Sequence, residues 1–175
     1  MSSGEAAPRV TPFHVGALTA PAAAAIAGWR YPPPYDFYNP FPDIAAYLID
    51  PANAYFAAYG LHDELAGFFC YGAEAQVFGG HVAGLYSGDA TLDLGLGMHP
   101  DLMGHGSGAP FVAAGLAFGR ARYRPRAFRL TVACFNTRAI RVYTQAGFVP
   151  GPVFPSPTAR GEVPFLLMQR AEPLP

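Results

Sequence analysis

The chain has 175 residues, enough for one domain with a sizeable core, and we expect a single domain over residues 1–175. Hydrophobic residues make up 51% of the sequence and charged residues 13%, which excludes a largely disordered protein. The formal net charge is −1, and no apolar run reaches the roughly 18 residues that would cross a bilayer. We therefore expect a cytoplasmic protein that contacts neither membrane nor nucleic acid.

The basic residues are all arginines, and seven of the eleven lie between Arg120 and Arg141. Such a segment is either a solvated surface or a positive face for an anionic cofactor. The two cysteines, Cys70 and Cys134, lie in apolar, strand-like surroundings, so buried thiols are expected in preference to a disulfide. The five histidines lack the spacing of metal ligands, and no metal site is expected.

In chain order, hydrophobic patterning first predicts a strand and an alanine-rich helix that begins with a proline. A loop rich in Pro, Tyr and Phe follows, then a short helix, two strands joined by a polar turn, and a glycine-rich irregular stretch. These segments are residues 10–18, 21–29, 31–42, 42–48, 54–61, 65–71 and 74–89, respectively.

The second half of the chain alternates strands and helices before it ends in two strands. The expected strands are residues 91–98, 128–133, 148–154 and 163–169, and the expected helices are residues 110–123 and 137–146. Residues 1–8 and 171–175 are expected to fray. The sum is about seven strands and four helices, which indicates an α+β (mixed α/β) domain.

The segment from Leu94 to Pro110 is the most informative part of the sequence. An apolar strand stops at Pro100, glycines follow at positions 104, 106 and 108, and an apolar helical pattern then begins. This order leaves backbone N–H groups unshielded where a helix dipole is positive, which suits phosphate oxygens, although glycines also mark simple turns. The spacing fits neither a P-loop nor the G-x-G-x-x-G of dinucleotide-binding folds.

A second informative segment runs from Asn136 to Phe148. Asn136 is a good helix N-cap, and Gly147 followed by Phe148 is a good helix stop. Asn136, Ile140 and Tyr143 are spaced i, i+4 and i+7, so a carboxamide and a phenol share one helix face. Taken alone, the pattern also describes a capped helix with an ordinary half-buried tyrosine.

Together the two segments resemble the GNAT superfamily of acetyltransferases, most clearly over residues 91–150. The family's pyrophosphate loop, Gln/Arg-x-x-Gly-x-Gly/Ala, corresponds to Met103-Gly104-His105-Gly106-Ser107-Gly108. The family's later helix, Asn-x-x-Ala-x-x-x-Tyr-x-x-x-Gly-Phe, is matched at Asn136, Ala139, Tyr143, Gly147 and Phe148. Met103 departs from the family, which has Gln or Arg there, so backbone amides must contribute more of the phosphate binding.

The resemblance implies a GNAT-like fold, with a twisted and mostly antiparallel central sheet, and acetyl-CoA as the acyl donor. The strand that ends at Met98 would pair its backbone with the pantetheine arm in a slot between splayed strands, and Asn136 would bind the pantetheine region. The loop amides would hold the pyrophosphate, and His105 would either donate to a phosphate or be solvated. The loop residues concerned are Gly104, His105, Gly106, Ser107 and Gly108.

The resemblance also implies a direct attack by the acceptor amine on the thioester in a ternary complex. Tyr143, which would also contact the cofactor, would give a proton to the leaving thiolate. Asp93 is the candidate general base, and strand alternation points it with Gly95 and Gly97, whose small size would leave it room. The alternative for Asp93 is a strand-edge charge or a group that orients the acceptor.

The candidate acceptor-binding residues lie in the aromatic segment that follows the first helix. They are Trp29, Tyr31, Tyr35 and Tyr38. In the resembled family this region commonly forms part of the acceptor wall, where aromatic rings favour a cationic amine. The alternative is a proline-stiffened lid packed on the core.

The expected activity is therefore transfer of an acetyl group from acetyl-CoA to a primary amine, either a small molecule or a peptide N-terminus. The alternative is a module without catalytic activity that binds acyl-CoA as a sensor or docks a partner. Dimers are common in the resembled family, so a homodimer is one expected assembly.

Overall fold

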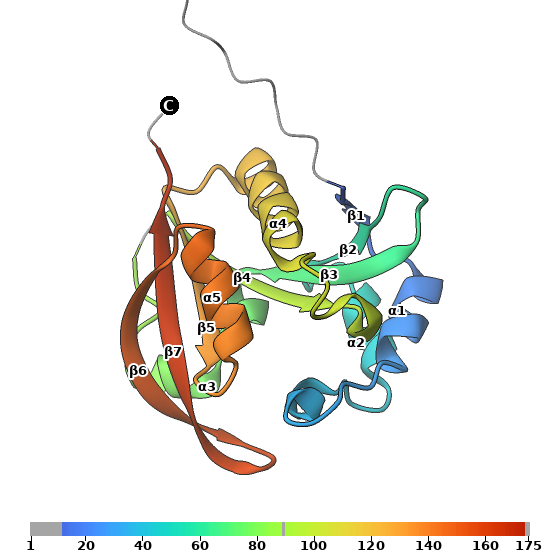
Figure 1. Cartoon of the computed structure of the whole chain (residues 1–175). Helices are drawn as coiled ribbons and strands as arrows, with labels where there is room; N and C mark the ends of the chain where they lie inside the picture. Colours follow the sequence, from blue (N-terminus) through green and yellow to red (C-terminus); the bar gives the residue numbers. More distant parts are fainter. Residues whose placement is uncertain (1–11, 89, 174–175) are drawn as a thin grey trace, which may run out of the picture.

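The computed structural model describes residues 12–88 and 90–173, which form one seven-stranded sheet with helices on both faces (Figure 1). The strands are β1 (His14–Ala17), β2 (Tyr55–Tyr59), β3 (Leu65–Tyr71), β4 (Thr91–Met98), β5 (Ala127–Ala133), β6 (Val149–Thr158) and β7 (Gly161–Ala171). The helices are α1 (Ala20–Ala27), α2 (Ile44–Ile49), α3 (Phe78–Val82), α4 (Gly108–Tyr123) and α5 (Thr137–Gln145). Three 3-10 turns, η1 (Tyr35–Tyr38), η2 (Gly72–Ala75) and η3 (Pro100–Leu102), complete the described elements.

The strand order is β1-β2-β3-β4-β5-β7-β6, and only the β4–β5 pair is parallel. The expected mixed α/β fold with a mostly antiparallel sheet is therefore confirmed. Helices α4 and α5 lie on one face of the sheet, and α1, α2 and α3 lie on the other (Figure 1). The loop from β4 into α4 lies near the middle of the sheet, beside α5.

Most expected elements are observed within a few residues of their expected bounds, and one helix was missed. Helix α3 falls in the stretch 74–89, where the glycines Gly79 and Gly80 hide any helical periodicity. Both glycines are needed, because a Cβ on Gly79 would overlap the backbone of Pro155 and one on Gly80 would press on the ring of Tyr86. Residues 10 and 11 of the first expected strand lie outside the described residues.

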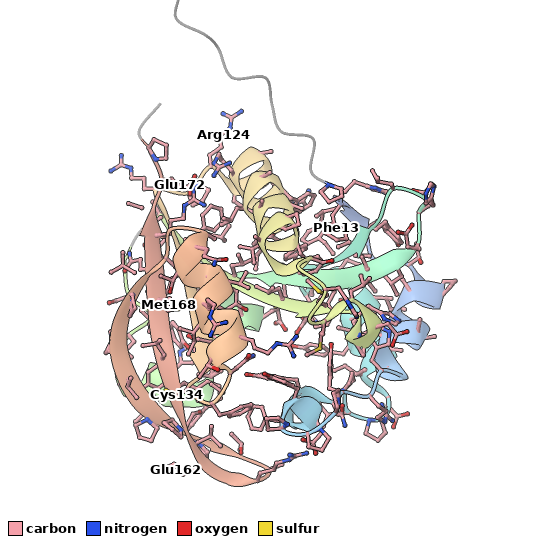
Figure 2. All side chains as sticks on the ribbon, in the orientation of Figure 1. Phe13, Arg124, Cys134, Glu162, Met168 and Glu172 are labelled. Carbon is pink, nitrogen blue, oxygen red and sulfur yellow. The ribbon has the colours of Figure 1, made fainter. Side chains whose placement is uncertain are left out.

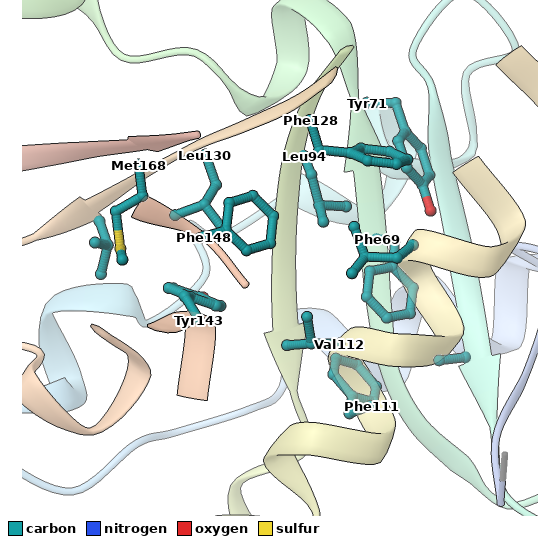
Figure 3. Close-up of a cluster of buried hydrophobic side chains, with 13 residues drawn as sticks. Phe69, Tyr71, Leu94, Phe111, Val112, Phe128, Leu130, Tyr143, Phe148 and Met168 are labelled. Atoms are coloured by element: carbon teal, nitrogen blue, oxygen red, sulfur yellow. The ribbon is translucent and has the colours of Figure 1, made fainter. Parts of the chain in front are cut away.

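The main core lies between the sheet and helices α4 and α5 and combines aromatic with aliphatic side chains (Figure 3). Phe69 and Phe111 stack with ring centroids 4.6 Å apart, and both side chains are fully buried. The approach of α4 to the sheet depends on Gly115, because a Cβ there would overlap the ring of Phe69. The buried apolar members of this core include Tyr71, Leu94, Val112, Phe128, Leu130, Tyr143, Phe148 and Met168.

The two central strands stay together for only three residue pairs. Thr91, Leu92 and Asp93 of β4 pair with Ala127, Phe128 and Arg129 of β5. Beyond that point β4 continues to Met98 beside β3, and β5 continues to Ala133 beside β7. The strands thus part after Asp93, which is the splayed arrangement that the resemblance implied.

The described C-terminal end is ordered by ion pairs, whereas residues 171–175 were expected to fray. Strand β7 extends through Ala171, and the next residue is the buried Glu172, labelled in Figure 2. Its carboxylate pairs with Arg120 at 2.6 Å and Arg170 at 3.3 Å. Residues 1–8, 174 and 175 lie outside the described residues. None of the described helices combines the length and the apolar character that a membrane crossing requires.

We expect Gly115→Ala to lower the free energy of unfolding by about 1–3 kcal/mol, because the added methyl group must displace the ring of Phe69. The better helix propensity of alanine recovers at most about 1 kcal/mol. Urea denaturation measures the difference. Gly16→Ala is the matched control, since no atom of the described residues lies within 4 Å of its added carbon. A Gly115→Ala variant as stable as the wild type would contradict this account of α4 packing.

Candidate functional site

The point where β4 and β5 part is held by a buried ion pair. The Asp93 carboxylate accepts hydrogen bonds from Arg129 Nε at 2.6 Å and Nη2 at 2.8 Å. A third bond comes from Gln76 Nε2 at 2.7 Å. Asp93 is 3% exposed and Arg129 is 5% exposed. Asp93 and Arg129 are also the last residues at which β4 and β5 pair with each other. The ion pair therefore lies at the point where the two strands separate, which we call the fork.

The remaining guanidinium nitrogen of Arg129, Nη1, binds the backbone of the segment that follows α3. Its Nη1 donates to the carbonyl oxygens of Leu85 at 2.8 Å and Ser87 at 3.0 Å. Its Cζ lies 5.0 Å from the ring centroid of Tyr86, whose hydroxyl is 2.9 Å from the hydroxyl of Thr131 on β5. One arginine therefore fixes β4, β5 and the residues that follow α3.

The expected free space around Asp93 is filled. A Cβ on Gly95 would overlap the sulfur of Cys70, and one on Gly97 would overlap the ring of Phe68. These glycines admit neighbouring side chains from β3, which pairs with this part of β4. Asp93 is consequently a carboxylate with both oxygens engaged at the closed end of the fork.

At its other end β4 leads into the glycine loop. Gly104 and Gly106 have φ values of 82° and 80°, a left-handed conformation that favours glycine. Helix α4 begins at Gly108, and the side chain of its N-cap, Ser107, makes no capping hydrogen bond. Within the described residues, the N–H groups of residues 104–108 have no hydrogen-bond partner. The loop therefore carries unused donors next to the positive end of a 16-residue helix.

Helix α5 runs beside this loop at close range. A Cβ on Gly108 would lie 2.9 Å from Cγ2 of Val142, and a Cβ on Gly104 would lie 2.7 Å from Nη2 of Arg138. Arg138 and Val142 are one helical turn apart, so one face of α5 follows the loop. Arg138 was not among the residues that the sequence singled out, and its guanidinium Cζ also lies 5.4 Å from the ring centroid of Tyr35.

Asn136 and Tyr143 occupy the start and the middle of α5. The Oδ1 of Asn136 accepts from the N–H of Ala139 at 3.2 Å, which confirms the expected N-cap, and its Nδ2 donates to the hydroxyl of Tyr38 at 3.4 Å. Tyr143 is 9% exposed, and its hydroxyl has no hydrogen-bond partner among the described residues. Burial, and to a lesser degree Tyr38, raises the pKa of the Tyr143 phenol above its usual value, so the group is protonated at neutral pH.

The four aromatic residues expected to bind the acceptor separate into different environments. Trp29 is 6% exposed and packs on Phe68 and His99, so it is a core residue. The hydroxyl of Tyr31 donates to the carbonyl oxygen of Met98 at 2.9 Å, at the end of β4. Tyr35 lies against Arg138, and Tyr38 is 37% exposed.

The turn η1, which carries Tyr35 and Tyr38, is tied to the β6–β7 hairpin. Asp36 accepts from Nη2 of Arg160 at 2.9 Å, and this hydrogen bond lowers the pKa of the Asp36 carboxyl. Phe37 packs edge-on against Phe135 with ring centroids 5.3 Å apart. In Figure 2, Cys134 and Glu162 mark the end of the sheet beside η1. The aromatic segment is therefore a packed lid that leaves Tyr38 exposed at this end.

Three of the seven arginines between Arg120 and Arg141 make contacts that hold the fold. Arg120 pairs with Glu172, Arg129 pairs with Asp93, and Arg122 lies 5.1 Å from the ring centroid of Phe56. Both cysteines are free; Cys70 is buried, which raises the pKa of its thiol to about 12, and Cys134 is half-buried. In residues 12–88 and 90–173, no three His, Cys, Asp or Glu side chains lie close enough together to hold a metal ion.

Comparison with known proteins adds a family and a set of structural neighbours. The model of the acetyltransferase (GNAT) family matches residues 21–148. A GNAT-family acetyltransferase from Bacillus anthracis superposes with a TM-score of 0.69 at 14% identity, covering 91% of this chain and 95% of that one. A chimera of the Vibrio cholerae spermidine N-acetyltransferase SpeG and hSSAT gives 0.68 at 15% identity, with 91% and 95% covered. No curated protein sequence matches the chain.

We expect Asp93→Asn to lower the free energy of unfolding by about 3–5 kcal/mol, because it leaves the buried Arg129 guanidinium without its counter-charge. Urea denaturation at pH 7 measures the loss. Asp63→Asn removes a carboxylate whose side chain is 86% exposed, and this control should change stability by less than about 0.5 kcal/mol. Equal stability of the Asp93→Asn variant and the wild type would contradict a structural role for the ion pair.

Proposed function

The chain belongs to the GNAT acetyltransferase family, and from this premise we propose that it transfers the acetyl group of acetyl-CoA to a primary amine. The amine would attack the thioester directly while both substrates are bound. The observation that carries the proposal is the free edge of β4, which loses its partner β5 after Asp93 and leads into the glycine loop with its unused N–H groups.

On the donor side, the chain's own groups fit the parts of acetyl-CoA. The N–H groups of Gly104, Gly106 and Gly108 would suit a diphosphate, because this group needs several hydrogen-bond donors that no bulky side chain shields. Open space around Gly106 supports the same assignment, because no atom of residues 12–88 and 90–173 would lie within 4 Å of an added Cβ. The pantetheine arm would lie along β4 beyond Asp93, where the backbone lacks β5 as a partner.

The chemistry needs donors for the oxyanion and a proton for the sulfur. Free N–H groups of β4 near Met98 would stabilise the oxyanion as the amine nitrogen bonds to the acetyl carbon. When the carbon–sulfur bond breaks, the thiolate would take the phenolic proton of Tyr143. Because burial raises the pKa of Tyr143, the phenol holds its proton at neutral pH and is in the form that can donate to the sulfur.

We assign Asp93 a positioning role instead of that of general base. The Asp93 carboxylate accepts three hydrogen bonds that engage both of its oxygens, and at 3% exposure it is closed off from an incoming amine. Its proposed contribution is to hold β4 and β5 at the angle that opens the slot. Deprotonation of the amine would then pass to water.

For the acceptor we propose a primary amine that enters beside η1 and the end of β5. Tyr38 is the exposed aromatic ring there, whereas the Asp36 carboxylate of the same turn is paired with Arg160. The face of an aromatic ring attracts a cationic amine before it loses its proton. The neighbour from Vibrio cholerae, named as a spermidine N-acetyltransferase, supports amines as the first substrates to test.

The proposal is tested by following CoA release with a thiol reagent while acetyl-CoA is offered with a panel of polyamines, amino acids and peptides with free N-termini. Mass spectrometry should identify one acetylated product class with one acetyl group per CoA released. Heat on titration with acetyl-CoA but no product from any acceptor would support the sensor alternative. Neither heat nor turnover would overturn the proposal.

Tyr143→Phe should lower kcat by about 10²-fold, in line with the loss of a general acid, and change the affinity for acetyl-CoA less than about twofold. Because the pKa of Tyr143 is raised, the wild-type rate should show no loss from phenol ionisation below pH 10. Steady-state kinetics from pH 6 to 10 and calorimetric titration measure both effects. Equal losses in kcat and in affinity would assign Tyr143 to cofactor packing.

A further inference from the structure

We infer that Arg138 supplies the cationic contact to the diphosphate of the donor, and that Tyr35 holds its guanidinium in place. The inference deepens the proposed function and rests on it. It assigns a binding role to a residue on α5 and a positioning role to a residue in the aromatic lid. Neither role belongs to the glycine loop itself.

The first step is a shortage of charge in the loop. A diphosphate diester carries about two negative charges, whereas a helix N-terminus offers the equivalent of about half a positive charge. Met103 is a thioether where a cation or carboxamide would be useful, and residues 103–108 include no lysine or arginine, only the exposed His105. The loop therefore needs a full positive charge from another element.

The second step is the position of Arg138. Its Nη2 lies 2.7 Å from the point where a Cβ on Gly104 would be, and its Cζ lies 3.7 Å from that point. Two features therefore favour glycine at position 104. The absence of a Cβ leaves space for the guanidinium, and the backbone has a left-handed conformation with φ 82°. The contact brings five N–H donors beside the unused amides of residues 104–108.

The third step is the charge of this guanidinium. Among the described residues, no carboxylate forms an ion pair with Arg138, whereas Arg120, Arg129 and Arg160 each have one. Its positive charge is therefore available to an anion. A planar guanidinium can also donate two parallel hydrogen bonds to phosphate oxygens.

The fourth step is the support from Tyr35. The Cζ of Arg138 lies 5.4 Å from the centroid of the Tyr35 ring, within the range of a cation–π contact. Tyr35 belongs to η1, which Asp36 ties to Arg160 of the β6–β7 hairpin. The aromatic segment thereby reaches the donor loop through Arg138, and Tyr35 is placed on the donor side.

The test compares the binding of CoA and of 3′-dephospho-CoA by calorimetry at fixed ionic strength. Arg138→Gln should raise the Kd of both ligands by about tenfold or more, the loss expected for a charge-assisted hydrogen bond. Arg138→Lys should lie between Arg138→Gln and the wild type, because it keeps the charge without the planar fork. Arg141→Gln is the matched control, an exposed arginine on the same helix, and should change each Kd less than twofold.

Tyr35 is tested by a double-mutant cycle. Tyr35→Leu should weaken CoA binding by about threefold when Arg138 is present and have no further effect in the Arg138→Gln background, because a cation–π contact couples the two residues. The KM for acetyl-CoA should follow these Kd values while kcat stays within twofold of the wild type. Thermal unfolding without ligand checks that each variant is folded.

The outcomes separate the inference from the function on which it rests. A wild type that binds no CoA overturns the proposed function. A wild type that binds CoA, with Arg138→Gln binding equally well, overturns only the role of Arg138. A loss confined to CoA and absent with 3′-dephospho-CoA overturns the diphosphate assignment, because the contact is then with the 3′-phosphate. Additive losses in the cycle overturn the positioning role of Tyr35.

Discussion

The buried contact between Asp93 and Arg129 is the constraint on which the rest of this structure depends. A sheet gains most by keeping its strands paired, so two central strands that separate must be held at the point of separation. Here the last pair of β4 and β5 is itself an ion pair, with distances of 2.6 and 2.8 Å. A charge pair buried this deeply stabilises little by itself, yet it is costly to break. Strand separation is thereby fixed at one place.

The donor side follows from that separation together with the close approach of α5. Gly108 lets Val142 pack against the start of α4, and Gly104 lets the guanidinium of Arg138 lie beside the loop. Both contacts come from a single face of α5, whose start is capped by Asn136. Replacing either glycine would therefore disturb the loop and the helix together. The loop amides and α5 are best regarded as one unit with a shared geometry.

Much of the fold and part of the site could be predicted from the sequence. Alternation and capping gave β3, β4 and α5 almost to the residue, since their apolar periodicity and the Asn136 cap are local signals. The partners of Asp93 could not be predicted, because Gln76 and Arg129 lie 17 and 36 residues away and meet it only through sheet pairing. The one sequence signal for this partner is that Arg129 is a charged residue within an otherwise apolar strand, which indicates a buried counter-charge. Trp29 was expected to line the acceptor pocket, whereas it is buried against Phe68 and His99. These contacts are distant in sequence, so the burial of Trp29 could not be predicted.

The edge strand β6 has a consequence for how copies of this chain can associate. Four of its ten residues are prolines, at positions 150, 152, 155 and 157, and proline has no backbone N–H to donate. A strand from a second molecule would meet few backbone N–H donors along the outer edge of β6, so addition of a strand to this edge is disfavoured. Growth of the sheet across two subunits would have to use β1, whose four residues offer a short seam.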